Sequence, residues 1–158
     1  MVGHKMINVL YVDDEVNNLK PFIATFRRYF NVHTALSAKE ANQILDIVKD
    51  IHVLVTDQKI PETLGTELLE NAVKKYPKQT RIIVTAYPED KDVQEAEKMQ
   101  LIYAVIAKPW NADELQALII EGYDMYCSKM DLNLTVSKRD KAKKDLNKTI
   151  NKNSDTIE

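Results

Sequence analysis

The chain of 158 residues is 44% hydrophobic and 29% charged, with a formal net charge of −2, which is ordinary for one globular domain with a short extension. No apolar stretch reaches the roughly 18 residues of a membrane span, and no signal peptide precedes the first apolar run. The single cysteine, Cys127, excludes an internal disulfide, and the three glycines form neither a Walker A loop nor a dinucleotide-binding turn.

Apolar runs alternate with helical patterns along the chain. Strands are predicted at residues 7–12, 31–35, 52–57, 81–85 and 102–107. Helices are predicted at residues 17–30, 38–49, 64–75, 89–99 and 112–126, where apolar residues recur every three or four positions. Ser37 followed by Glu40 predicts a capping box, and Asn111 is the predicted N-cap of the last helix.

The order of these elements predicts the fold class. The first, third and fourth strands are almost wholly apolar, as expected of parallel strands that are covered on both faces. Five successive βα units therefore predict a doubly wound α/β domain with a five-stranded parallel sheet.

Several of the predicted strands end on a polar side chain. Asp13 and Asp14 follow the first strand, Asp57 and Thr85 end the third and fourth, and Lys108 follows the fifth. Ligands of such sheets bind beyond the carboxyl ends of the strands, so we expect these side chains to lie together. Any one of them could be a simple turn former or helix cap, but chance does not readily bring all five to one edge.

Three neighbouring carboxylates require a counter-charge. Two unit charges about 4 Å apart repel by about 4 kcal/mol at an effective dielectric constant near 20. A shared proton or a hard divalent cation such as Mg²⁺ would relieve this repulsion. Lys108 and Thr85 could then stabilise phosphoryl oxygens, with Asp57 as the attacking nucleophile.

Four motifs, in order and correctly spaced over about residues 5–126, give the chain a specific resemblance to the receiver domains of two-component response regulators. Asp13 and Asp14 match the acidic pair, and DQKIPETLG from Asp57 resembles D-x-x-M-P-x-x-x-G. Thr85 in TAY and Lys108 in KPW match the remaining motifs. The resemblance implies a flavodoxin-like fold with strand order 2-1-3-4-5 and a cis bond before Pro109.

The resemblance also implies a function. A sensor histidine kinase or a phosphotransfer protein would give its phosphoryl group to Asp57. Mg²⁺ would be held by Asp14, Asp57 and the backbone carbonyl of Lys59, and by Asp13 through water, while Lys108 and Thr85 would contact the phosphoryl group. Such a protein is a switch that catalyses only its own phosphorylation and dephosphorylation, and its downstream output partner is not identifiable from the sequence.

The sequence departs from the family pattern at two positions. Val105 stands where receivers usually carry Tyr or Phe, three residues before the site lysine, and Ile60 replaces the usual Met. Tyr103 lies two residues before Val105, on the same face of the predicted strand.

Two other functions are weighed against this one. A magnesium-dependent phosphatase of the haloacid dehalogenase type also uses an aspartyl nucleophile, but it needs a second Asp two residues later, where this chain has Lys59. A nucleic-acid-associated regulator could instead use the basic C-terminal segment, which has seven basic and two acidic residues between positions 138 and 152.

We expect residues 1–127 to form the receiver and residues 128–158 to form a polar, basic extension, helical or disordered. Leu132 and Val136 continue an apolar spacing, but Arg139 and Lys143 follow. The sequence therefore predicts at most a short helical extension, at most a weak dimer and no sequence-specific binding of nucleic acid. It also predicts a cytoplasmic protein without a membrane partner.

Overall fold

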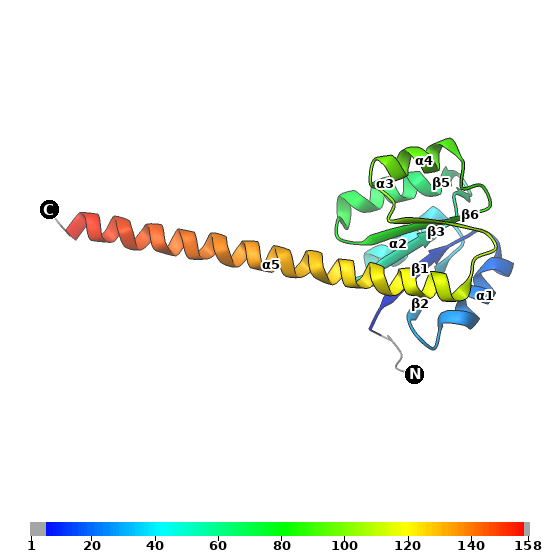
Figure 1. The fold of residues 1–158 in the computed structure, drawn as a ribbon, viewed down its shortest axis with the longest axis horizontal. Coiled ribbons are helices and arrows are strands. Elements are labelled where there is room, and N and C mark those ends of the chain that lie inside the picture. Colours follow the sequence, from blue (N-terminus) through cyan, green and yellow to red (C-terminus); the bar gives the residue numbers. More distant parts are fainter. Residues whose placement is uncertain (1–5, 157–158) are drawn as a thin grey trace. The chain divides into compact units, whose positions relative to one another are not determined.

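The computed structural model describes residues 6–156, and the predicted alternation of strands and helices is present in it (Figure 1). The strands of the main sheet are β1 (Asn8–Val12), β2 (Asn31–Ala35), β3 (Val53–Thr56), β6 (Thr80–Thr85) and β7 (Ala104–Ala107). The helices are α1 (Val16–Phe26), α2 (Ala38–Ile47), α3 (Gly65–Lys75), α4 (Lys91–Lys98) and α5 (Ala112–Thr156). A short antiparallel hairpin of β4 (Lys59–Ile60) and β5 (Thr63–Leu64) lies between β3 and α3.

The main sheet has five parallel strands in the order β2-β1-β3-β6-β7. Since β6 and β7 are the fourth and fifth strands of this sheet along the chain, the predicted order 2-1-3-4-5 is confirmed. The order reverses between β1 and β3, and the crevice beyond their carboxyl ends is the usual ligand site of such a sheet.

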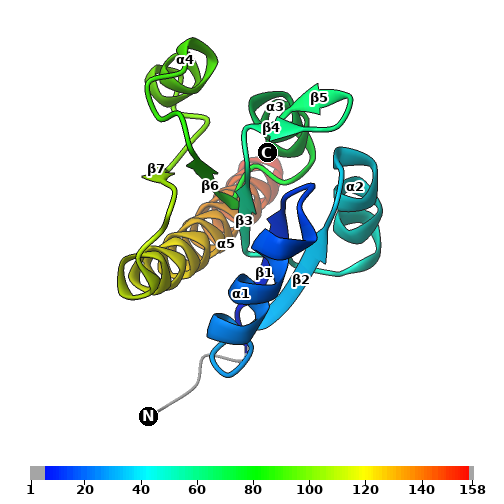
Figure 2. The same ribbon diagram turned by 90° about the vertical axis from the view of Figure 1, so that its right-hand side faces the viewer.

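Helices cover both faces of the sheet (Figure 2). On one face, buried residues of α1 and the first turns of α5 pack against inward-facing strand residues, in a cluster that includes Phe22, Phe26, Leu115 and Ile119. On the other face, buried residues of α2, α3 and α4 form a second cluster, which includes Leu45, Leu68, Leu69 and Val93. Strands that are buried on both sides explain the nearly continuous apolar runs of the sequence.

The two predicted helix caps are present. Ser37 Oγ accepts a hydrogen bond from Glu40 N (3.1 Å), and Glu40 Oε2 accepts one from Leu36 N (2.8 Å), so the reciprocal bond goes one residue before the N-cap. Asn111 Oδ1 accepts a hydrogen bond from Glu114 N (2.9 Å) at the start of α5.

Helix α5 corrects the prediction of a short helical extension, because it continues to Thr156. No glycine or proline follows Gly122, so the later residues include neither of the two strong helix breakers. A shortage of apolar heptads limits how helices pair, but it does not end a helix. The chain divides into two compact units, Met1–Tyr126 and Cys127–Glu158. Among the described residues, no helix combines the length and the apolar character that crossing a bilayer requires.

Candidate functional site

The three predicted carboxylates meet where the strand order reverses. Asp13 and Asp14 follow β1, and Asp57 follows β3, whose last residue Thr56 pairs with Val12. Oxygen atoms from the three carboxylates lie within 4.8 Å of one another. Asp13 is buried, Asp57 is partly buried and Asp14 is exposed, so the cluster opens to solvent on one side.

Lys108 crosses from the end of β7 to join this cluster. Its Nζ atom lies 2.9 Å from Asp13 Oδ2 and 3.0 Å from Asp57 Oδ2. The Lys108–Pro109 peptide bond is cis, as the resemblance implies. Burial alone would lower the pKa of Lys108, but its hydrogen bonds to Asp13 and Asp57 outweigh that effect and raise the pKa above its ordinary value. Lys108 is therefore a charged bridge between two carboxylates.

Asp13 is held by donors of the protein itself. Its Oδ2 accepts from Tyr11 OH (3.0 Å) as well as from Lys108, and its Oδ1 accepts from Glu15 N (3.0 Å). The amide of Asn18 lies 3.1 Å and 3.2 Å from the two oxygens. Burial alone would raise the pKa of Asp13, but these hydrogen bonds, with that from Lys108 the largest, lower it below its ordinary value.

The roles of Tyr11 and Asn18 were not predicted from the sequence. Burial, and then the negative charge of Asp13, raise the pKa of Tyr11 well above its ordinary value, so its hydroxyl remains a donor. Tyr11 had the appearance of an ordinary core residue of β1. The available signal was its spacing, because a residue two positions before Asp13 points to the same face of an extended strand.

The loop after β3 holds the side chain of Asp57 and the backbone of Gln58. Gln58 N donates to Asp57 Oδ1 (2.7 Å), and the buried side chain of Gln58 accepts from Thr66 N (3.0 Å) at the start of α3. Gly65 N donates to Gln58 O (2.7 Å), and a β-carbon on Gly65 would collide with the backbone oxygen of Asp57. The glycine of the D-x-x-M-P-x-x-x-G pattern is thus needed here for a close approach of two backbone segments.

Thr85 lies at the end of β6, next to the segment that carries Lys108. Its Oγ1 accepts from Tyr87 N (3.1 Å), and its carbonyl oxygen accepts from Lys108 N (2.9 Å). The ammonium group of Lys59 lies 4.6 Å from the centre of the Tyr87 ring. Tyr103 donates to Glu121 Oε2 (2.9 Å) on α5, and Val105 packs on the edge of the core.

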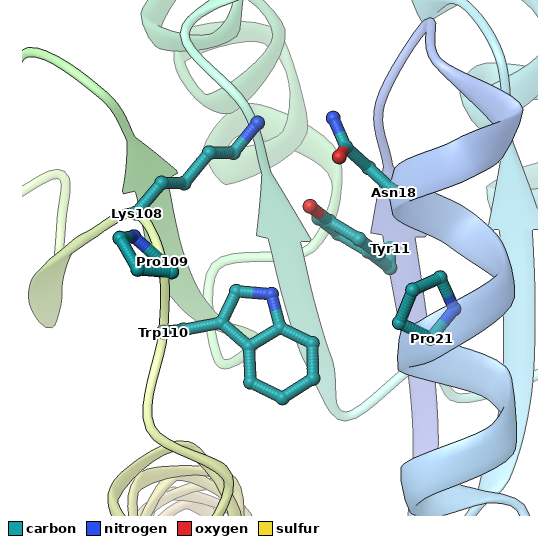
Figure 3. A pocket seen from close by; sticks show the side chains of 6 residues that line it. All are labelled: Tyr11, Asn18, Pro21, Lys108, Pro109 and Trp110. Carbon is teal, nitrogen blue, oxygen red and sulfur yellow. The ribbon is translucent and has the colours of Figure 1, made fainter.

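A pocket of about 500 Å³ adjoins the acidic cluster. It is lined by Tyr11, Asn18, Pro21, Lys108, Pro109 and Trp110. Figure 3 shows the polar ends of Tyr11, Asn18 and Lys108 directed into the space between α1 and the segment after β7, with the rings of Pro21 and Trp110 on its walls. Because those three polar groups also bind Asp13, a group that enters the pocket comes next to the cluster.

This set of groups suits a hard divalent cation and a phosphoryl group. The three carboxylates and Lys108 together carry two net negative charges. The oxygens of Asp13 are already occupied by protein donors, whereas Asp14 has an exposed carboxylate. Oxygen ligands of this kind, with open positions for water and phosphate, are those that Mg²⁺ prefers.

Comparison with known proteins agrees with this geometry. The family model of the response regulator receiver domain matches residues 9–120. The hydrogenase transcriptional regulatory protein HoxA of Cupriavidus necator is 31% identical over 141 residues, which are 86% of this chain and 29% of that protein. The chain spans less than a third of the length of the curated relatives that it matches.

Solved structures show the same fold. A CheY-like response regulator receiver domain protein from Methanospirillum hungatei is 27% identical, with a TM-score of 0.72 over 78% of this chain and 98% of that chain. The signal receiver domain of an HD domain-containing protein from Pseudomonas fluorescens is 24% identical, with a TM-score of 0.74 over 83% of this chain and 96% of that chain. With the family model covering most of its length and the acidic cluster at the edge where the strand order reverses, the chain belongs to the response regulator receiver domain family.

Proposed function

We propose that this receiver accepts a phosphoryl group on Asp57 from a phosphohistidine of a sensor histidine kinase or a phosphotransfer protein. The observation that carries the proposal is the cluster of Asp13, Asp14 and Asp57, whose oxygens lie within 4.8 Å of one another and are bridged by Lys108. Asp57 is the proposed nucleophile because it follows the buried strand β3 and its carboxylate, 15% exposed, contacts the ammonium of Lys108 at 3.0 Å.

The transfer is a substitution at phosphorus. A carboxylate oxygen of Asp57 forms a bond to the phosphorus atom, the phosphorus–nitrogen bond breaks, and the imidazole nitrogen leaves with the electron pair. The product is an aspartyl phosphate, which water later hydrolyses. The backbone of Asp57 is held by the bond from its N to Val12 O, and its side chain by the bond from Gln58 N, so little reorganisation is needed for the attack.

Mg²⁺ would lie beside Asp57. Asp14, Asp57 and the backbone carbonyl of Lys59 would hold it, with Asp13 acting through water because its oxygens already accept hydrogen bonds. When bound, the ion would offset negative charge on the carboxylates and on the phosphoryl oxygens.

Lys108 and Thr85 would stabilise the transferred group. Lys108 is charged and lies 3.0 Å from Asp57 Oδ2, so a short movement of its flexible side chain would bring the ammonium to a phosphoryl oxygen. The oxygen of Thr85 accepts from Tyr87 N, and its hydroxyl hydrogen can be directed at another phosphoryl oxygen.

The biological role of such a site is signalling, and the chain is not proposed to be an enzyme that turns over external substrates. An output partner would distinguish the phosphorylated state from the unphosphorylated one. Lys59, where the dehalogenase-type phosphatases have a second Asp, counts against that alternative. A single cysteine is consistent with the reducing cytoplasm that we propose as its location.

Intact-mass measurement tests the acceptor. Acetyl phosphate with Mg²⁺ should add one phosphoryl group to the wild-type chain, and Asp57→Asn should abolish the addition. Asp124→Asn, at an exposed position of α5, is the matched control and should be labelled like the wild type. Undiminished labelling of Asp57→Asn would place the acceptor at another residue.

Metal titration tests the assigned ligand. Trp110 lies two residues from Lys108 and lines the adjoining pocket, so its fluorescence should report Mg²⁺ binding. Asp14→Ala removes one charged ligand and should weaken binding by about tenfold or more. An unchanged affinity in Asp14→Ala would show that Asp14 is not a ligand.

A further inference from the structure

The part of α5 that lies in the second compact unit exposes large aliphatic side chains. Leu132 is 64% exposed, Val136 is 46% exposed, Leu146 is 60% exposed and Ile150 is 52% exposed. The residues between them are mostly charged or polar. A helix of this kind gains much of its stability from burying an apolar stripe, since the formation of helix alone is marginal in water.

The four aliphatic side chains fall on one seam of a heptad pattern, with two basic residues between the two pairs. Leu132, Val136, Arg139, Lys143, Leu146 and Ile150 are separated by four, three, four, three and four residues. In a heptad this alternation corresponds to successive d and a positions, which form one seam along the helix. The outer positions of the seam are aliphatic and its two central positions are basic.

We propose that this seam pairs two copies of the chain as a parallel, in-register two-stranded coiled coil over residues 132–150. A second copy is the occupant that the sequence fits, because each aliphatic layer then meets an identical layer. The proposal is independent of phosphorylation at Asp57.

The acidic residue beside the central layers selects the parallel orientation. Asp140 occupies the e position, directly after Arg139 at d. In a parallel pair, a d side chain packs against the e residue of the partner helix, so each Arg139 meets the other copy's Asp140. In an antiparallel pair, e positions face each other, and the two Asp140 carboxylates would repel.

The same central layers limit the strength of the pair. Two copies each of Arg139 and Lys143 lie close together, and two Asp140 carboxylates offset only part of their charge. The dimer is therefore weak and depends on concentration. Added salt screens the repulsion and should tighten the pair, whereas an electrostatic contact with nucleic acid weakens as salt rises.

Sedimentation of the full chain tests the pairing. Leu146→Gln replaces an aliphatic seam residue and should weaken the dimer by about tenfold or more. Lys148→Gln also introduces a glutamine, but at a position outside the seam, two residues after Leu146. It should change the dissociation constant of the dimer by less than about threefold. A chain that stays monomeric at millimolar concentration and high salt, or equal effects of the two variants, would overturn the proposal.

Disulfide trapping tests the orientation. In a Cys127→Ser background, Val136→Cys places a thiol in the seam, and mild oxidation should link two chains through it. Lys141→Cys faces away from the seam and should cross-link much more slowly. If Lys141→Cys links as fast as Val136→Cys, or if only an antiparallel combination of Val136→Cys with Leu146→Cys forms a link, the parallel pair is wrong.

Discussion

Lys108 already supplies part of the positive charge that the acidic cluster needs. Its ammonium contacts Asp13 and Asp57 at 2.9 Å and 3.0 Å. A divalent cation that binds the same carboxylates comes close to this ammonium, and the two positive charges repel. Under the proposed function Lys108 would therefore have two opposed effects, because it would weaken metal binding and would prepare the site for a phosphoryl group.

Replacing Lys108 should separate these two effects. Lys108→Met keeps most of the side-chain volume and removes the charge, so Mg²⁺ should bind about threefold to tenfold more tightly by calorimetry. Phosphoryl acceptance by Asp57, followed by intact mass, should slow by about a hundredfold, because one charged donor is lost. Lys74→Met, an exposed change on α3, is the control and should alter neither quantity. Weaker metal binding in Lys108→Met would contradict the competition.

His52 is a second titratable residue in a restrictive environment, at the opposite end of the sheet. Its Nδ1 accepts from Asn8 N (2.9 Å), and its ring meets those of Tyr123 and Tyr126 at 4.9 Å and 4.8 Å. Burial lowers the pKa of His52 from 6.5, although the nearby charge of Asp50 partly offsets this effect. A proton on Nδ1 would also remove the acceptor that Asn8 N uses.

Stability should therefore fall in mild acid. The unfolded chain binds a proton at His52 more readily than the folded chain does, so the contribution of His52 is complete above pH 6.5 and is lost as the pH falls through the lower folded pKa. Urea unfolding between about pH 7.5 and about pH 5 should show a smaller loss for His52→Gln than for the wild type. His33, whose pKa is also lowered by burial, leaves a residual slope in both proteins. Equal pH dependence in the two proteins would exclude His52 as a source.

At the scale of single residues, the sequence predicted the site residues that directly follow strands. It did not predict the residues that hold those site residues in place. Asp13, Asp14 and Asp57 could be placed together because the carboxyl ends of parallel strands share one edge. The supporting contact of Gln58 could not be predicted, because it depends on how the loop turns back to Thr66 at the start of α3. Roles that arise from such contacts have no periodic signal in the chain.

At the scale of elements, helix α4 ends with an uncommon residue in a common motif. Leu101 N donates to Ala96 O (3.0 Å) and Gln100 N donates to Glu97 O (3.1 Å), the paired bonds of a Schellman motif. Gln100 takes the left-handed position of the motif, with φ of 60°. Glycine is the usual residue there, since a β-carbon is disfavoured in this conformation.

Glycine should consequently have opposite effects at two positions near α4. Gln100→Gly relieves the left-handed conformation and should raise the free energy of unfolding by about 0.5–1 kcal/mol. Gln94→Gly makes the same change at an exposed position inside the helix and should lower it by about 1 kcal/mol. Urea denaturation of the two variants beside the wild type measures both effects. A loss of stability in Gln100→Gly would mean that the side chain of Gln100 makes a contribution larger than the conformational penalty.

The sequence-based predictions were wrong for the shortest and the longest elements. The two short strands were not predicted, and the end of the longest helix was placed too early. Strands β4 (Lys59–Ile60) and β5 (Thr63–Leu64) have two residues each, too few to show an alternating pattern. Helix α5 was expected to end early, because its apolar spacing meets Arg139 and Lys143. A helix can continue past the end of its apolar stripe where no breaker intervenes, so periodicity did not predict the end of this helix.

At the scale of the whole molecule, the receiver has all the parts of a self-sufficient domain. Every residue of the two core clusters lies within Met1–Tyr126, as do the carboxylates, Thr85 and Lys108. The second unit, Cys127–Glu158, is instead a single helical segment over its described residues. Chemistry and self-association are thus expected to be separable.

A chain that ends at Cys127 should keep the chemistry of the site and lose self-association. It keeps the core and the acidic cluster, so its Mg²⁺ affinity and its rate of phosphorylation by acetyl phosphate should stay within about twofold of the full chain. It lacks the seam from Leu132 to Ile150, so it should sediment as a monomer at every concentration. The full chain should shift toward a dimer as the protein concentration and the salt concentration rise. Parallel titrations, intact-mass time courses and sedimentation runs on the two chains measure these quantities. A shortened chain that still dimerises would move the interface to the receiver, and one that loses Mg²⁺ affinity would show that the extension supports the site.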